Sequence, residues 1–120
     1  MNADRLARVI ERNAIFLFSD YIWSSGDNLE ISHQLKTLNP RCLMIHGGPD
    51  APKYQGDVDE FFETNPFVDI VVHGEGEVTF AEMLAALAPS LLAGEADLTA
   101  LDDVAGLSYR TSTGPVRTAD

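Results

Sequence analysis

Two aromatic rings lie in the segment Ser19 to Ser24, beside hydroxyl and carboxylate groups and directly after an apolar run. Exposed rings at the end of a rigid strand suit stacking against a planar ligand or a partner protein. The rings of Tyr21 and Trp23 equally suit folding back over the core, and both interpretations stay open. Asp20 is not favoured as a phospho-acceptor, because the sequence lacks the second acidic cluster upstream that would hold Mg²⁺.

A second candidate segment is Gly47-Gly48-Pro49, which follows the apolar run 42–45. Glycine has no Cβ, so the backbone here can turn tightly and approach a flat or bulky group, and the proline stiffens the exit. An ordinary strand-to-helix turn has the same composition. Taken alone, this motif therefore predicts either a close backbone contact with a ligand or a simple turn.

The third candidate is Gly74-Glu75-Gly76-Glu77, which lies between an apolar run and an amphipathic segment. A phosphate-binding loop would combine glycines with a lysine, so the two glutamates argue against that role. Each glutamate can stabilise the positive end of the following helix by about 0.3–1 kcal/mol. They can also accept hydrogen bonds from a neutral polar ligand with amide or hydroxyl donors, and both roles are compatible.

The remaining chemically reactive side chains do not form a catalytic or metal-binding pattern. His33, His46 and His73 fall on different predicted elements, whereas metal sites need two to four ligands at helical or loop spacing. We expect solvent-facing roles for His46 and His73 at the ends of strands. Cys42, the only cysteine, lies in an apolar run and is expected to be a buried thiol. This chain alone therefore cannot supply the cysteines of an iron–sulfur cluster.

The charge of the chain disfavours two classes of partner. It has 19 acidic and 8 basic side chains in 120 residues, a formal net charge of −11. That field repels phosphate backbones and anionic lipids, so we expect neither nucleic acid nor a membrane as a partner. No apolar run approaches the roughly 20 residues that span a bilayer, and the first residues lack the order of a signal peptide. We expect a single domain over residues 1–120, located in the cytoplasm.

Alternating helices and strands position the three candidate segments. The apolar runs 14–18, 42–45 and 68–72 show no polar alternation, which is typical of strands buried on both faces of a parallel sheet. Amphipathic patterns predict helices before, between and after these strands. This order predicts an α/β domain with a largely parallel sheet, whose ligands bind beyond the carboxyl ends of the strands. All three candidate segments follow such ends.

Finer expectations concern the faces and ends of these elements. The helix over residues 27–39 should bury Ile31, Leu35 and Leu38. The last long helix should bend or end near Ala88, because Pro89 follows. Residues 107–109 alternate like a half-exposed strand, and residues 112–114 could turn this strand into a hairpin.

Several segments, in this order, resemble the cobalamin-binding domain of radical-SAM enzymes. The subgroup includes the anaerobic magnesium-protoporphyrin ester cyclase and related methyltransferases. The last of these segments, residues 104–110, is similar to the segment of the family's proteins that leads toward the catalytic barrel. The matching segments are residues 19–23, 47–49, 65–69, 74–80 and 104–110.

This resemblance implies a Rossmann-like (flavodoxin-like) three-layer sandwich with a mostly parallel sheet, across whose carboxyl ends cobalamin lies. The Asp-x-His-x-x-Gly motif of methionine-synthase-type domains is missing from this sequence, so the cofactor would lack that histidine ligand to cobalt. The resemblance implies that the cofactor-binding residues are Ser19, Tyr21, Trp23, Gly47, Gly48, Pro49, Gly74, Glu75, Gly76 and Glu77.

The family's iron–sulfur motif, C-x3-C-x2-C, is also missing here. The resemblance thus implies that the 4Fe-4S cluster and S-adenosylmethionine belong to a barrel outside this chain. We expect this chain to be a non-catalytic cobalamin-binding module whose parent is a cobalamin-dependent radical-SAM enzyme of the methyltransferase or cyclase type. The alternatives are a flavodoxin-like module for another small ligand, and a protein-interaction domain with no small ligand.

The family also has a strand, a helix and a second strand before the segment that matches residues 3–13. We therefore expect a domain truncated at its N-terminal side, with weak or absent cobalamin binding of its own. The strand over residues 15–18 would then lie at a sheet edge without charge or proline, and such edges recruit other chains. We expect self-association through this edge strand.

Overall fold

The computed structural model describes residues 15–19, 25–48, 55–73, 76–93 and 96–119. The helix expected within residues 2–13 lies outside these ranges. The other expected helices and strands are found, which confirms the α/β order. The elements are β1 (Ile15–Ser19), α2 (Ser25–Leu38), β2 (Leu43–Gly47), α3 (Gln55–Thr64), β3 (Ile70–Val72), α4 (Gly76–Leu92), the 3₁₀ helix η1 (Leu98–Asp103), β4 (Leu107–Thr111) and β5 (Gly114–Arg117).

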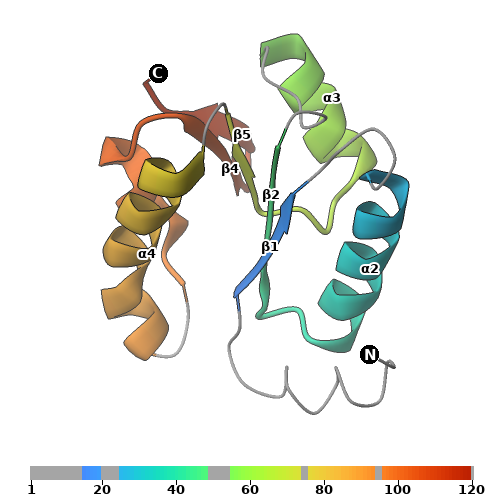
Figure 1. The fold of residues 1–120 in the computed structure, drawn as a ribbon, viewed down its shortest axis with the longest axis horizontal. Coiled ribbons are helices and arrows are strands. Elements are labelled where there is room, and N and C mark those ends of the chain that lie inside the picture. The colour runs from blue at the N-terminus through green and yellow to red at the C-terminus, as the bar shows by residue number, and fades with distance from the viewer. Residues whose placement is uncertain (1–14, 20–24, 49–54, 74–75, 94–95, 120) are drawn as a thin grey trace.

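The five strands form one open sheet in the order β1-β2-β3-β4-β5. The first three strands are parallel, and the β4–β5 hairpin adds two antiparallel pairings. Helices α2 and α3 lie on one side of the sheet and α4 on the other, as Figure 1 shows. The predicted Rossmann-like, three-layer arrangement is therefore confirmed.

Alternation along the strands divides the core between these two sides. In β2, Leu43 and Ile45 pack with Met83 and Leu87 of α4, whereas Met44 packs with Leu35 of α2. All five residues of β2 are buried, as expected for a strand covered on both faces. β1 is less covered and lies at the edge of the described sheet, where Leu17 is 48% exposed. Self-association through β1 stays a prediction.

Helix α2 presents a different face to the sheet from the one we expected. Leu35 is buried, but Ile31 and Leu38 are 43% and 51% exposed. Ser32 is fully buried instead, and its Oγ lies 3.1 Å from Nε2 of His46. A buried hydroxyl is tolerated when it has a hydrogen-bond partner. The apolar pattern did not predict this face of α2, because the face includes the buried polar residue Ser32.

Strand β4 is also more buried than expected. Leu107, Ser108 and Tyr109 are all buried, because β4 lies between β3 and β5 and is covered on both faces. Leu107 and Tyr109 join the core under α4. The polar Ser108 points to the other face and contacts His73. The predicted hairpin, formed with β5, is confirmed.

Helix α4 does not end near Ala88 but continues through Pro89 to Leu92. Proline removes the N–H that would bond to the carbonyl of Ala85. Both residues are exposed, so water can bond to that carbonyl instead. The helix turn is continued by the N–H of Ala93, which donates to the Pro89 carbonyl at 3.2 Å.

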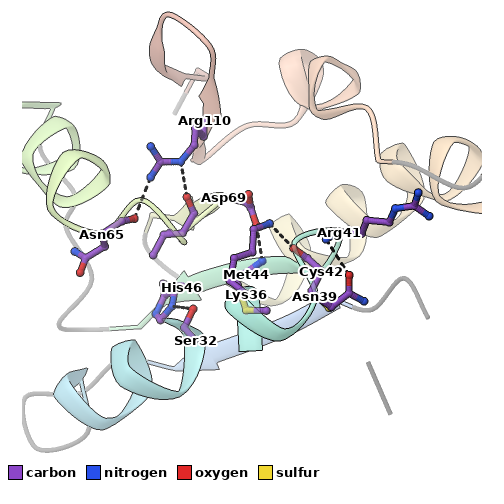
Figure 2. Close-up of polar contacts among 11 residues, drawn as sticks. Ser32, Lys36, Asn39, Arg41, Cys42, Met44, His46, Asn65, Asp69 and Arg110 are labelled. Atoms are coloured by element: carbon purple, nitrogen blue, oxygen red, sulfur yellow. Dashed lines mark hydrogen bonds and ion pairs between the residues drawn. The ribbon is translucent and has the colours of Figure 1, made fainter. Parts of the chain in front are cut away.

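A carboxylate at the amino ends of the parallel strands joins α2, β2 and β3. Asp69 Oδ2 accepts from Lys36 Nζ at 2.8 Å and from the Met44 N–H at 2.8 Å. Lys36 Nζ also donates to the Cys42 carbonyl at 2.5 Å. The Asp69 N–H donates in turn to the Met44 carbonyl at 2.9 Å. Figure 2 shows this cluster of Lys36, Cys42, Met44 and Asp69, which we call the Asp69 clamp.

Arg110 extends the Asp69 clamp to β4 and α3. Its backbone N–H donates to the Asp69 carbonyl, and its guanidinium donates to the carbonyls of Val68, Phe62 and Asn65 at 2.8, 2.8 and 3.0 Å (Figure 2). The guanidinium carbon also lies 4.9 Å from the centre of the Phe62 ring. Burial lowers the pKa of Arg110 from its ordinary value, and the Asp69 charge opposes that shift.

Asp69→Ala should destabilise the protein by about 2–4 kcal/mol, because the buried Met44 N–H loses its acceptor and Lys36 loses its ion-pair partner while keeping the Cys42 carbonyl. Urea unfolding measures the change. Glu30→Ala is the control, since Glu30 accepts only an exposed hydrogen bond from Gln34, and we expect a change within about 0.5 kcal/mol. Equal losses from the two substitutions would contradict the role given to the Asp69 clamp.

The Tyr109 phenol is buried under α4 and hydrogen-bonds to the Asp102 carboxylate. That hydrogen bond, followed by burial and the nearby negative charges of Asp102 and Asp97, raises the pKa of Tyr109 to about 12 from 10.0. The folded state therefore favours the protonated phenol. This stabilisation is fully present below the pKa that Tyr109 has in the unfolded chain. It is lost as the pH rises toward the higher pKa that Tyr109 has in the folded protein.

We therefore expect the free energy of unfolding in urea to fall between pH of about 9 and about 11, and to fall more for the wild type than for Tyr109→Phe. Phenylalanine keeps the ring in the core, and Asp102 is exposed to solvent in any case. The same alkaline loss in both proteins would show that Tyr109 does not titrate as described.

Candidate functional site

The carboxyl ends of the three parallel strands meet along one edge of the sheet. Ser19, the last residue of β1, lies in register with Gly47, the last residue of β2. A Cβ added at Gly47 would lie 3.5 Å from the Cβ of Val72, the last residue of β3. The described ends of β1, β2 and β3 thus lie side by side.

We call this region the carboxyl edge and define it by Ser19, Gly47, Gly48, His73 and Gly76. The structure describes Gly47 and Gly48 in full, and it places the backbones of Ser19, Gly76 and Glu77 at the ends of β1 and α4. The other predicted site residues, Tyr21, Trp23, Pro49, Gly74 and Glu75, lie outside the described residues.

The two glycines that follow β2 have different structural requirements. Gly48 adopts a φ of 99°, a conformation that residues with a side chain rarely take. Gly47 is not in that region, and an added Cβ would make only ordinary contacts, at 3.5 Å and 3.7 Å from Val72 atoms. The turn itself therefore accounts for glycine at position 48. It does not account for glycine at position 47.

His46 is fully buried, so the solvent-facing role expected for it is wrong. Its Nε2 lies 3.1 Å from Ser32 Oγ (Figure 2), and its ring stacks on Phe18 at 4.8 Å between centroids. Phe61 of α3 meets the same ring edge-on at 6.1 Å. The side chain points under the α2 and α3 layer because alternate residues of a strand face opposite sides of a sheet.

His73, directly after β3, is half-buried rather than fully solvent-facing. Its Nε2 lies 2.9 Å from the Oγ of Ser108 in β4, and its N–H donates to the Gly106 carbonyl at 2.7 Å. The roles of Gly106 and Ser108 were not predicted from the sequence. The signal that could have indicated them is the position of Gly106 directly before the strand that begins at Leu107.

The described part of the carboxyl edge holds two consecutive glycines, of which Gly47 is buried and Gly48 is half-buried. Within the described ranges, no group of three or more histidine, cysteine, aspartate or glutamate side chains is placed to hold a metal ion. No helix among the described residues is long and apolar enough to cross a membrane. At the centre of the edge, Gly47 and Gly48 have no side chain to keep a flat group from the backbone.

No family model matches this chain. It is 36% identical over 108 residues, 90% of its length, to the cobalamin-dependent radical SAM methyltransferase TokK of Streptomyces tokunonensis. It is 35% identical over 102 residues, 85% of its length, to the 2-(S-pantetheinyl)-carbapenam-3-carboxylate methyltransferase of Streptantibioticus cattleyicolor. The chain spans 14% of the length of each relative. The similarity to TokK confirms the predicted resemblance to cobalamin-dependent radical-SAM enzymes.

Gly48→Ala should destabilise the protein by about 1–2 kcal/mol, the cost of a side chain in a left-handed conformation. Gly47→Ala is the matched control at the neighbouring position, and its Cβ finds space, so we expect a smaller loss. Urea unfolding of both variants measures the difference. A larger loss from Gly47→Ala than from Gly48→Ala would contradict this account of the turn.

Proposed function

We propose that this chain, a homologue of one segment of cobalamin-dependent radical-SAM methyltransferases, is part of a cobalamin-binding module and is not itself catalytic. The observation that carries the proposal is the 36% identity to TokK over 108 residues, because that relative is cobalamin-dependent. The convergence of Ser19, Gly47 and Val72 along one edge supports it, since ligands of open α/β sheets bind at such edges.

In this proposal the corrin lies over the carboxyl edge. Gly47 and Gly48 allow it to approach the end of β2, while Ser19 and the amino end of α4 lie on either side. When bound, cobalamin supplies the methyl-transfer chemistry, and the protein contributes binding and orientation. We assign the remaining contacts to Tyr21, Trp23, Pro49, Gly74, Glu75, Gly76 and Glu77.

In this proposal the cofactor is held without a histidine ligand to cobalt, because the sequence lacks the Asp-x-His-x-x-Gly motif. His46 is fully buried with its Nε2 against Ser32, and the Nε2 of His73 contacts Ser108. His33, on α2, stacks on Phe67 at 5.0 Å, away from the strand ends.

We further propose that a radical-SAM barrel, with its 4Fe-4S cluster and S-adenosylmethionine, acts together with this module in a longer parent chain. The only cysteine here, Cys42, is buried beside Leu35 and Met44 at the opposite edge of the sheet. A cytoplasmic location agrees with this chemistry. The net charge of −11 disfavours nucleic acid or an anionic membrane as a partner.

The two alternatives are a flavodoxin-like module for a different small ligand and an interaction domain without one. Both rest on the fold, which hosts many functions. The similarity to a cobalamin-dependent enzyme favours cobalamin over either alternative.

The parent protein, expressed with a supply of cobalamin, should copurify with a corrin absorption spectrum that lacks the signature of an imidazole-ligated cobalt. The 120-residue chain alone should bind hydroxocobalamin more weakly, as measured by titration. A parent protein that copurifies with a different chromophore would favour the first alternative, and one that binds no small ligand would favour the second. An imidazole-ligated cobalt would contradict the assignment of the histidines.

A further inference from the structure

The imidazole of His46 contacts three other elements near the end of β2. Its Nε2 lies 3.1 Å from the Oγ of Ser32 in α2, and both side chains are fully buried (Figure 2). Its ring stacks on Phe18 of β1 with 13° between the two planes, and Phe61 of α3 meets it edge-on. We call Phe18, Ser32, His46 and Phe61 the His46 cluster. One side chain of β2 therefore joins β1, α2 and α3.

The His46 cluster lies next to the carboxyl edge on two strands. Phe18 and His46 are register partners in β1 and β2, and the residues that follow them, Ser19 and Gly47, are the register partners that end these strands. Along the chain, β1 is followed by α2 and β2 is followed by α3. The contacts of His46 thus reach both strand ends and both of the helices that follow them.

We infer that His46 is a positioning residue, which holds the carboxyl ends of β1 and β2 and the helices α2 and α3 in one fixed arrangement. Ser32 fixes the direction of the imidazole, because a hydrogen bond requires its two partners to be aligned. The ring held in this way then fixes Phe18 and Phe61 by aromatic contact. The inference rests on the proposed function for its consequence, which is tighter binding of cobalamin by a pre-organised carboxyl edge.

The amino half of the same strand shows that packing alone does not require a polar pair. Met44 lies two residues before His46, faces the same side of the sheet and is fully buried. It packs with Leu35 and Phe16 through apolar contacts. Exchanging both partners of a buried hydrogen bond for apolar groups of the same shape is nearly neutral for stability. The contact between His46 and Ser32 therefore contributes mainly a defined geometry.

The first measurement is amide exchange in the 120-residue chain without ligand, because exchange reports local opening. We call residues 17–19 and 46–47 the carboxyl halves of β1 and β2, and residues 15–16 and 43–44 their amino halves. His46→Leu and Ser32→Ala should each raise the exchange of protected amides in the carboxyl halves by about 3- to 10-fold relative to those in the amino halves. That range is expected for the loss of one buried hydrogen bond.

Met44→Val is the matched control for this measurement. It removes apolar contacts from the same strand and the same face of the sheet, but it leaves every member of the His46 cluster in place. A general loosening of the core should therefore appear in this variant too. We expect Met44→Val not to raise the exchange of the carboxyl halves relative to the amino halves.

The second measurement is the Kd of the parent protein for hydroxocobalamin, with the same substitutions. His46→Leu and Ser32→Ala should each raise the Kd by about 3- to 10-fold. The double variant should raise it no further than His46→Leu alone, because both substitutions remove the same contact. Met44→Val should leave the Kd unchanged, since a loss of stability does not alter the affinity of a protein that stays folded.

Unchanged relative exchange of the carboxyl halves in His46→Leu and Ser32→Ala would overturn the inference, whatever the ligand does. The same selective increase in Met44→Val would also overturn it. If His46→Leu does not fold, Ser32→Ala, which keeps the ring, decides both measurements.

The ligand separates this inference from the proposed function. A selective increase in exchange, together with a wild-type parent protein that binds no hydroxocobalamin, would support the positioning role and contradict the proposed function. A selective increase in exchange with an unchanged Kd, in a parent protein that does bind, would overturn the inference that His46 positions the binding edge.

Discussion

The contact on which the rest of this structure depends is the Asp69 carboxylate between Lys36 and the Met44 N–H, at 2.8 Å from each. It is placed where the last turn of α2, the start of β2 and the start of β3 meet. Arg110 adds β4 and the end of α3 to the same cluster. Because backbone carbonyls and the carboxylate satisfy both cations, these charges can lie partly buried without a large cost. The amino edge of the sheet is therefore a structural edge.

This division into two edges explains why the family resemblance has two kinds of motif. The segment 65–69 and Arg110 belong to the amino edge, where they form hydrogen bonds within the protein. The segments at residues 47–49 and 74–77 begin at the opposite edge, where β2 and β3 end. The amino-edge segments hold the strands in register, and in our proposal the carboxyl-edge segments contact the cofactor. A relative that binds a different ligand could keep the amino-edge segments and change those at the carboxyl edge.

The sequence was sufficient to predict the buried strands, because these are unbroken apolar runs. It was not sufficient to predict which buried polar side chains contact each other. The unbroken runs in β2 and β3 identified both buried strands, and their order placed the candidate segments along one edge. The pairs Ser32–His46 and Ser108–His73 were missed, since each joins residues far apart in the chain. Each pair buries a serine, which made the faces of α2 and β4 differ from the expected ones. The positive φ of Gly48 was also not predictable, because ligand approach and a tight turn both favour glycine.

In our proposal the carboxyl edge binds cobalamin, while the amino edge only supports the fold. The most direct test is to follow all backbone amides of the 120-residue chain by nuclear magnetic resonance as hydroxocobalamin is added, since this method detects weak binding. We expect the shifted amides to cluster at Ser19, Gly47, Gly48, His73 and Gly76. Shifts centred on Lys36, Met44, Asp69 and Arg110 instead would contradict it.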